Sequence, residues 1–235
     1  MSSLNPRETL DRALRALLDE LLVLGDMVAD AVRTAVSSLK ERDLAASQNV
    51  YLADEEINKK HFEIEDRCIT LIATQQPMAK DLRLLAAVLE ITTELERMGD
   101  YAKGIAKINL LLGTEPLIKP LIDIPRMADI SLDMLHRALD AFVAGDVETA
   151  REIPKEDDQV DALYNQVYRE LVTYMIADTS TIDGANFLQW AAHNLERMAD
   201  RVTNICERTI YMVTGEMREL DHTDDEMDLF DKYKT

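Results

Sequence analysis

Apolar residues recur with helical spacing along almost the whole of this 235-residue chain. From Glu8 to about Lys40 they stand three or four positions apart, as a helix with one buried face requires. Only 7 Gly and 6 Pro occur, so there are few places at which a helix can end and turn back. These features predict an all-α protein made of long helices.

Helix-breaking residues divide the pattern into six long runs. The first is followed by runs from Asp43 to about Thr74 and from about Ala79 to Leu112, which Gly113 ends. A fourth run goes from Met127 to Ala144 and ends at Gly145.

The fifth run begins at Asp146, a good N-cap, and continues to Ala177 with a kink or restart at Pro154. The sixth goes from about Asp183 to Thr214 and ends at Gly215. Each half of the chain therefore contributes three runs.

The two halves match segment by segment, which predicts a duplicated three-helix unit. We therefore expect two pseudo-symmetric three-helix bundles with up-down topology: residues 1–113 and 127–214, a Pro-rich junction at 114–126, and an acidic, mobile tail at 215–235. The matching pairs are KERDLAAS (40–47) with VAGDVETA (143–150), DEEIN (54–58) with DDQVD (157–161), and ELERMGDYA (94–102) with NLERMADRV (194–202).

The formal charge of −19 excludes some classes of partner. So acidic a surface repels nucleic acid and anionic lipid head groups, whereas cations and basic protein patches are compatible with it. Solubility alone also accounts for acidic charge. Cys68 and Cys206 lie inside apolar helical patterns and are expected to be core residues. No signal-peptide pattern or membrane-spanning run occurs, so a cytoplasmic position is expected.

One phrase occurs twice, ERMGD at 96–100 and ERMAD at 196–200. Each copy places two carboxylates four residues apart, Glu96 with Asp100 and Glu196 with Asp200. On a helix such like charges are neighbours, at a cost of roughly 0.2–0.5 kcal/mol unless a positive charge compensates them.

The preceding helix of each half supplies further oxygen donors. Asn58 lies 18 residues before the bend near Gln76 and Glu96 lies 20 after it, so the two helices are expected to be level at these residues. Such oxygen-rich sites suit magnesium, calcium, manganese or iron, and zinc also accepts carboxylates. The predicted ligands are Asp54, Asn58, Glu96 and Asp100 in the first half and Asp157, Asp161, Glu196 and Asp200 in the second.

Two other interpretations of these acids remain open. They could be solvated and paired with nearby bases such as Lys103, Lys107, Arg97, Arg197 and Arg201. Alternatively, His193, three residues before Glu196, invites comparison with ferritin-type di-iron proteins, although the order of the two residues is reversed here. His61, His136 and His222 are interpreted as ordinary surface or boundary residues. No catalytic motif is present, so an enzyme is not expected.

The stretch DLRLLAAVLEITTELERMGDYAKGIAK (81–107) closely resembles the signature of the PhoU family of phosphate-specific transport system accessory proteins. QQPMAKDLR (75–83), KERDLAAS and NLERMADRVTNI (194–205) fit it as well, and the similarity extends from Glu8 to Thr214. The resemblance implies metal binding through acid-x-x-x-Asp motifs. This sequence departs from the motif at Asn58, whose amide carries no charge.

The resemblance also implies a function by binding and not by turnover. Family members look like negative regulators of phosphate uptake and of the phosphate-starvation response. They are thought to bridge the ATPase subunit of the phosphate ABC transporter and the sensor histidine kinase, at the inner face of the membrane and only peripherally through these partners. A homodimer or higher homo-oligomer is expected. The competing hypotheses are a carboxylate-bridged metal oxidase of ferritin type and a purely structural helical adaptor.

Overall fold

The computed structural model describes residues 6–217, 219 and 220. Within these residues the chain is helical and contains no strand, which confirms the predicted fold class. The elements are α1 (Pro6–Glu41), α2 (Leu44–Gln75), α3 (Ala79–Leu112), α4 (Asp123–Ala144), α5 (Val147–Glu152), the 3-10 helix η1 (Ile153–Glu156), α6 (Asp157–Ala177), the 3-10 helix η2 (Thr179–Thr181) and α7 (Ile182–Thr214).

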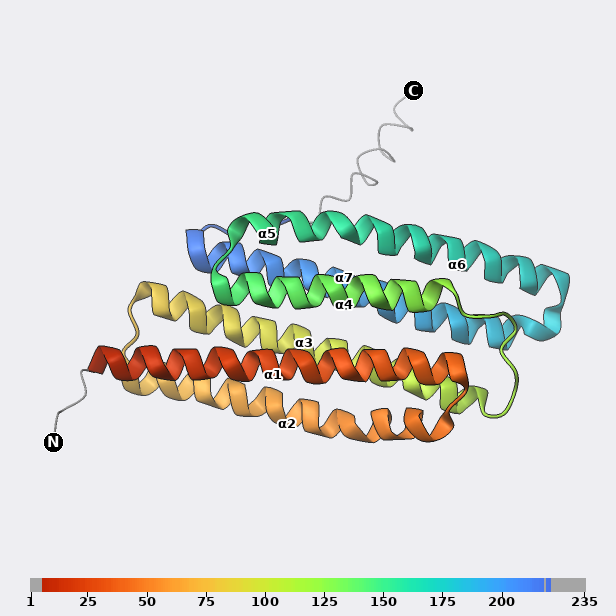
Figure 1. Ribbon diagram of the computed structural model, residues 1–235, viewed down its shortest axis with the longest axis horizontal. Helices are drawn as coiled ribbons and strands as arrows, with labels where there is room; N and C mark the ends of the chain where they lie inside the picture. Colours follow the sequence, from red (N-terminus) through yellow and green to blue (C-terminus); the bar gives the residue numbers. More distant parts are fainter. Residues whose placement is uncertain (1–5, 218, 221–235) are drawn as a thin grey trace, which may run out of the picture.

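The helices form two layers of three, with α5, η1 and α6 together acting as one interrupted helix (Figure 1). Helices α1, α2 and α3 pack on one another, as do α4, α6 and α7. The two bundles meet where α3 packs along α7 and α1 packs against α4. The predicted pair of up-down bundles is therefore confirmed.

Local signals fix most of the helix ends. The Asp146 carboxylate accepts hydrogen bonds from the backbone N–H groups of Glu148 and Thr149, each at 3.1 Å, so it is the predicted N-cap. Gly113, Gly145 and Gly215 follow the helices that they were predicted to end, and all three have positive φ. The predicted acidic tail lies mostly outside the described residues.

Pro154 interrupts the helical chain as predicted, whereas Pro125 does not delay the start of α4. The chain restarts at Pro154 as predicted, because the 3-10 helix η1 separates α5 from α6 there. The start predicted at Met127 is wrong, since α4 begins four residues earlier, at Asp123. Pro125 is then in the first turn of α4, where its missing N–H has no partner to lose. The junction between the bundles is correspondingly shorter than expected.

Both cysteines belong to the core, as the sequence indicates. Cys68 and Cys206 are fully buried and free of disulfides. Burial raises the pKa of each thiol to about 12, so neither forms a reactive thiolate at neutral pH. Among the described helices, none has the length and apolar character needed to span a bilayer.

The contact between α1 and α4 depends on Gly25. A Cβ atom at this position would stand 2.3 Å from Cδ1 of Leu139, which is buried in the core of both bundles. Gly25→Ala is therefore expected to lower the free energy of unfolding by about 1 kcal/mol. Overpacking costs about 1–3 kcal/mol, and the better helix propensity of alanine offsets roughly 1 kcal/mol of it.

Chemical denaturation of a double-mutant cycle tests this expectation. In a Leu139→Ala background the clash is absent, so Gly25→Ala should there be neutral or stabilising. Equal effects in the two backgrounds would show that the close approach of Leu139 is not the cause.

Candidate metal sites

The first cluster of predicted ligands lies between α2 and α3, centred on Asp54. Its side chain is buried, and Oδ2 accepts hydrogen bonds from Lys103 Nζ at 2.6 Å and from Asn58 Nδ2 at 3.2 Å. The other oxygen, Oδ1, is buried with no hydrogen-bond partner. Lys103 belongs to α3, so α2 and α3 are level here.

Glu96 and Asp100 complete the negative charge of the first cluster. Partial burial and repulsion by Asp100 raise the pKa of Glu96. Partial burial and repulsion by Asp54 raise the pKa of Asp100, although Lys103 opposes this. The three carboxylates therefore lie within electrostatic reach of one another.

His61 also belongs to the first cluster, although the sequence was interpreted otherwise. Its Nδ1 lies 2.5 Å from the Thr92 hydroxyl on α3, and positive charge on His61 lowers the pKa of Glu96. Its spacing is the signal that could have identified it. His61 lies seven residues after Asp54 and three after Asn58, on the same face of α2.

The second cluster lies between α6 and α7, around Glu196. Burial, followed by repulsion from Asp200 and Asp161, raises the pKa of Glu196 to about 7, and Arg197 opposes the shift. Glu196 Oε2 is buried and makes no hydrogen bond, although His193 Nδ1 lies 3.2 Å away. Asp157 begins α6, one turn before Asp161.

Each cluster thus has one imidazole, but the two imidazoles stand on helices that do not correspond to each other in the two bundles. In the first bundle His61 is on α2, whereas in the second His193 is on α7 and its ring centroid lies 6.1 Å from that of Tyr164 on α6. Tyr164 is the position that matches His61, and Thr93 is the one that matches His193.

The bases considered as partners in the sequence divide between two roles. Arg197 Nη1 donates to Asp200 Oδ2 at 2.9 Å, as the solvated interpretation expects. Arg201 does not face the cluster of its own helix. Its guanidinium instead contacts Glu94 on α3 at 3.2 Å and the Tyr101 hydroxyl at 3.4 Å, so it joins the two bundles.

The carboxylate and amide oxygens of both clusters are ligands that hard cations prefer, but their side chains do not point toward a common centre. Over residues 6–217, 219 and 220, no group of three or more His, Cys, Asp or Glu side chains is arranged to hold a metal ion. The backbone nevertheless brings acids together in each bundle. Each cluster also has a buried carboxylate oxygen without a hydrogen-bond partner, on Asp54 and on Glu196. Such an oxygen can accept a cation when the side chains turn toward one another.

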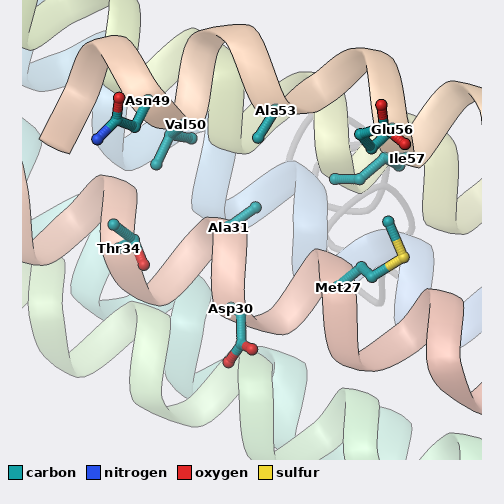
Figure 2. Close-up of a pocket in the computed structure, with 9 residues that line it drawn as sticks. All are labelled: Met27, Asp30, Ala31, Thr34, Asn49, Val50, Ala53, Glu56 and Ile57. Atoms are coloured by element: carbon teal, nitrogen blue, oxygen red, sulfur yellow. The ribbon is translucent and has the colours of Figure 1, made fainter.

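A separate hollow of about 360 Å³ lies between α1 and α2 (Figure 2). It arises where Ala31 of α1 and Ala53 of α2 face each other, because two methyl groups leave space between the helices. Asp30 at its edge points away from the hollow and pairs with Arg33 at 2.5 Å. None of the predicted ligands lines it, so it is not part of either cluster.

A family model supports the duplicated architecture. The model of the PhoU domain matches the chain twice, at residues 21–108 and 124–209. These two segments correspond to the two bundles.

Proteins similar to this chain cover nearly all of it. It is 34% identical to a phosphate-specific transport system accessory protein PhoU homolog of Aquifex aeolicus, over 87% of this chain and 92% of that protein. It is 32% identical to the accessory protein PhoU of Escherichia coli, over 92% and 91%.

Crystal structures agree with these matches. PhoU from Pseudomonas aeruginosa aligns with a TM-score of 0.83 and 32% identity over 88% of this chain and 99% of that one. The phosphate transport system regulatory protein PhoU from Streptococcus pneumoniae aligns with a TM-score of 0.82 and 32% identity over 89% and 99%.

Proposed function

This chain belongs to the PhoU family, and on that premise we propose that it is an accessory regulator of phosphate transport. In this proposal it represses phosphate uptake and the phosphate-starvation response. It acts as a metal-binding adaptor between the ATPase subunit of the phosphate transporter and the sensor histidine kinase. A cytoplasmic position, peripheral to the membrane through these partners, and a homo-oligomeric state remain predictions.

The observation that carries the proposal is the match to accessory proteins over nearly the whole chain, both bundles included. The relatives are accessory and regulatory proteins by name, which supports binding and not turnover.

The metal part of the proposal rests on the second cluster. Asp161 on α6 and Asp200 on α7 lie within electrostatic reach of Glu196, and burial with repulsion by both aspartates raises the pKa of Glu196 to about 7. A bound divalent ion would offset the repulsion that Asp200 and Asp161 exert on Glu196. Asp157 and Asp161 from α6 with Glu196 and Asp200 from α7 would hold it and so tie the two helices together.

Of the competing hypotheses, the ferritin-type oxidase has the least support, because the matched family and relatives are PhoU proteins. A purely structural adaptor differs from the proposal only in the metal. Elemental analysis of protein purified without an affinity tag separates the two, since the structural adaptor requires no bound ion.

Deletion of the gene in its own host tests the regulatory role. We expect phosphate-responsive genes to stay expressed in phosphate-rich medium, and a plasmid copy of the wild type to restore repression. The variant Glu196→Gln/Asp200→Asn should restore it only in part. Asp158→Asn, which removes a charge from the exposed face of α6, should restore it fully. Normal repression in the deletion strain would refute the proposed function.

A further inference from the structure

At matching sequence positions, the formal charges of the two carboxylate clusters differ by two units, which is the charge of one divalent ion. The first comprises three carboxylates, the neutral Asn58 and the ammonium of Lys103, a formal charge of −2. The matching positions of the second are four carboxylates and Thr203, a formal charge of −4, beside which Arg197 bonds Asp200 at 2.9 Å. Asn58 in place of an aspartate removes one negative charge, and Lys103 in place of a threonine adds one positive charge. Both side chains bond the same atom, Asp54 Oδ2.

Lys103 is placed as a bound cation would be. Its Nζ lies 2.6 Å from Asp54 Oδ2, and the side chain of Asp54 is only 4% exposed. The Tyr51 ring offers a second favourable surface, with its centroid 5.4 Å from the same nitrogen. The hydrogen bond to Asp54 and attraction by Asp54 and Asp100 raise the pKa of Lys103, so its ammonium stays charged.

We propose that Lys103 is the resident cation of the first cluster, so that this cluster holds no metal and only the second depends on one. The statement about the second cluster rests on the proposed function; the statement about the first does not. The two copies of the motif have thus diverged into a site occupied by its own lysine and an ion-dependent site.

The physical reason is competition. A divalent ion at Asp54 must displace an ammonium that is tethered a few ångströms away and therefore always present at high effective concentration. It must also bind beside that retained positive charge, with an uncharged amide at Asn58 in place of a carboxylate. In the second cluster Thr203 stands at the position of Lys103 and carries no charge, and the cation there is Arg197, which bonds Asp200, the residue that matches Asp100 and not Asp54.

Binding of Mn²⁺ to the full chain tests this, measured by calorimetry and by the loss of the free Mn²⁺ electron paramagnetic resonance signal. We expect Glu196→Gln/Asp200→Asn to abolish binding and Asp54→Asn to leave it unchanged. In the Glu196→Gln/Asp200→Asn background, adding Lys103→Met should create a site at least tenfold tighter than that background shows. Asp54→Asn should remove this new site, and Lys103→Arg, which keeps the charge, should not create it.

Each result distinguishes the two ideas. If Asp54→Asn removes Mn²⁺ from the wild type, the first cluster binds metal and the inference is overturned. The inference also fails if Lys103→Met folds by circular dichroism yet gains no site. If the wild type binds no Mn²⁺ while Lys103→Met creates a site in the Glu196→Gln/Asp200→Asn background, the metal part of the proposed function fails and the role of Lys103 stands. Should Lys103→Met not fold, the comparison of Asp54→Asn with the wild type still decides.

Discussion

Replacing Asn109 with leucine is expected to lower the free energy of unfolding by about 3–5 kcal/mol, because several buried polar groups lose their partner together. Asn109 is fully buried. Its Nδ2 donates to the carbonyl oxygens of Ser38 at 3.0 Å and Asp43 at 3.2 Å and to the Ser47 hydroxyl at 2.7 Å. Its Oδ1 accepts a hydrogen bond from Arg42.

This network closes the turn between α1 and α2 onto α3. Arg42 has a positive φ of 61°, which is unfavourable for a side chain of its size. Its guanidinium also donates to the carbonyl of Gly113 at 2.8 Å, and so fixes the end of α3. Leucine preserves the volume of Asn109 and offers none of these bonds, so the turn and the helix end lose their connection.

Urea denaturation measures the effect. Asn165→Leu on the exposed face of α6 is the matched control and should change the free energy of unfolding by less than about 0.5 kcal/mol. A loss below about 1 kcal/mol for Asn109→Leu would mean that water satisfies the exposed carbonyls in the variant.

Glu196→Gln is expected to stabilise the metal-free protein at pH 8 by about 2–3 kcal/mol. The folded protein raises the pKa of Glu196 from 4.5 to about 7. As the pH rises from 4.5 to 7, the unfolded chain therefore loses the proton while the folded chain retains it, and stability falls. Above pH 7 the loss is complete. Glutamine does not ionise, so the variant avoids this loss.

The measurement is the free energy of unfolding in the presence of a chelator, at pH 4 and at pH 8. Wild type and variant should agree at pH 4 and diverge toward pH 8. Glu148→Gln, whose side chain is 89% exposed, should follow the wild type at both values. Parallel curves for wild type and Glu196→Gln would show that the Glu196 carboxyl titrates as it does in the unfolded chain.

Adding Mn²⁺ at pH 8 is expected to reverse the ranking. On the proposed function, the ion stabilises the folded wild type by mass action, and Glu196→Gln loses a charged ligand and most of this gain. The same substitution thus removes a repulsion in one state and a ligand in the other. A variant that remains more stable than the wild type at saturating Mn²⁺ would argue for repulsion alone.

The sequence by itself determined the helices, their pairing into two bundles and the level at which the acids meet. Apolar spacing and caps such as Asp146 act over a few residues, so they can be recognised without tertiary structure. The level of Asn58 and Glu96 follows from nearly equal helix lengths on either side of one bend.

Only the tertiary structure decided which charges compensate one another. Lys103 was considered as a partner of Glu96 or Asp100, and its ammonium instead bonds Asp54, 49 residues away. Arg201 instead bonds Glu94 on α3, in the other bundle. His61, which was interpreted as an ordinary surface or boundary residue, lies in the first cluster beside Thr92 and Glu96. Every base has several acids within reach along the sequence, and the choice depends on how each helix is rotated and which carboxylate is most buried. Those quantities arise only when α2, α3, α6 and α7 pack together.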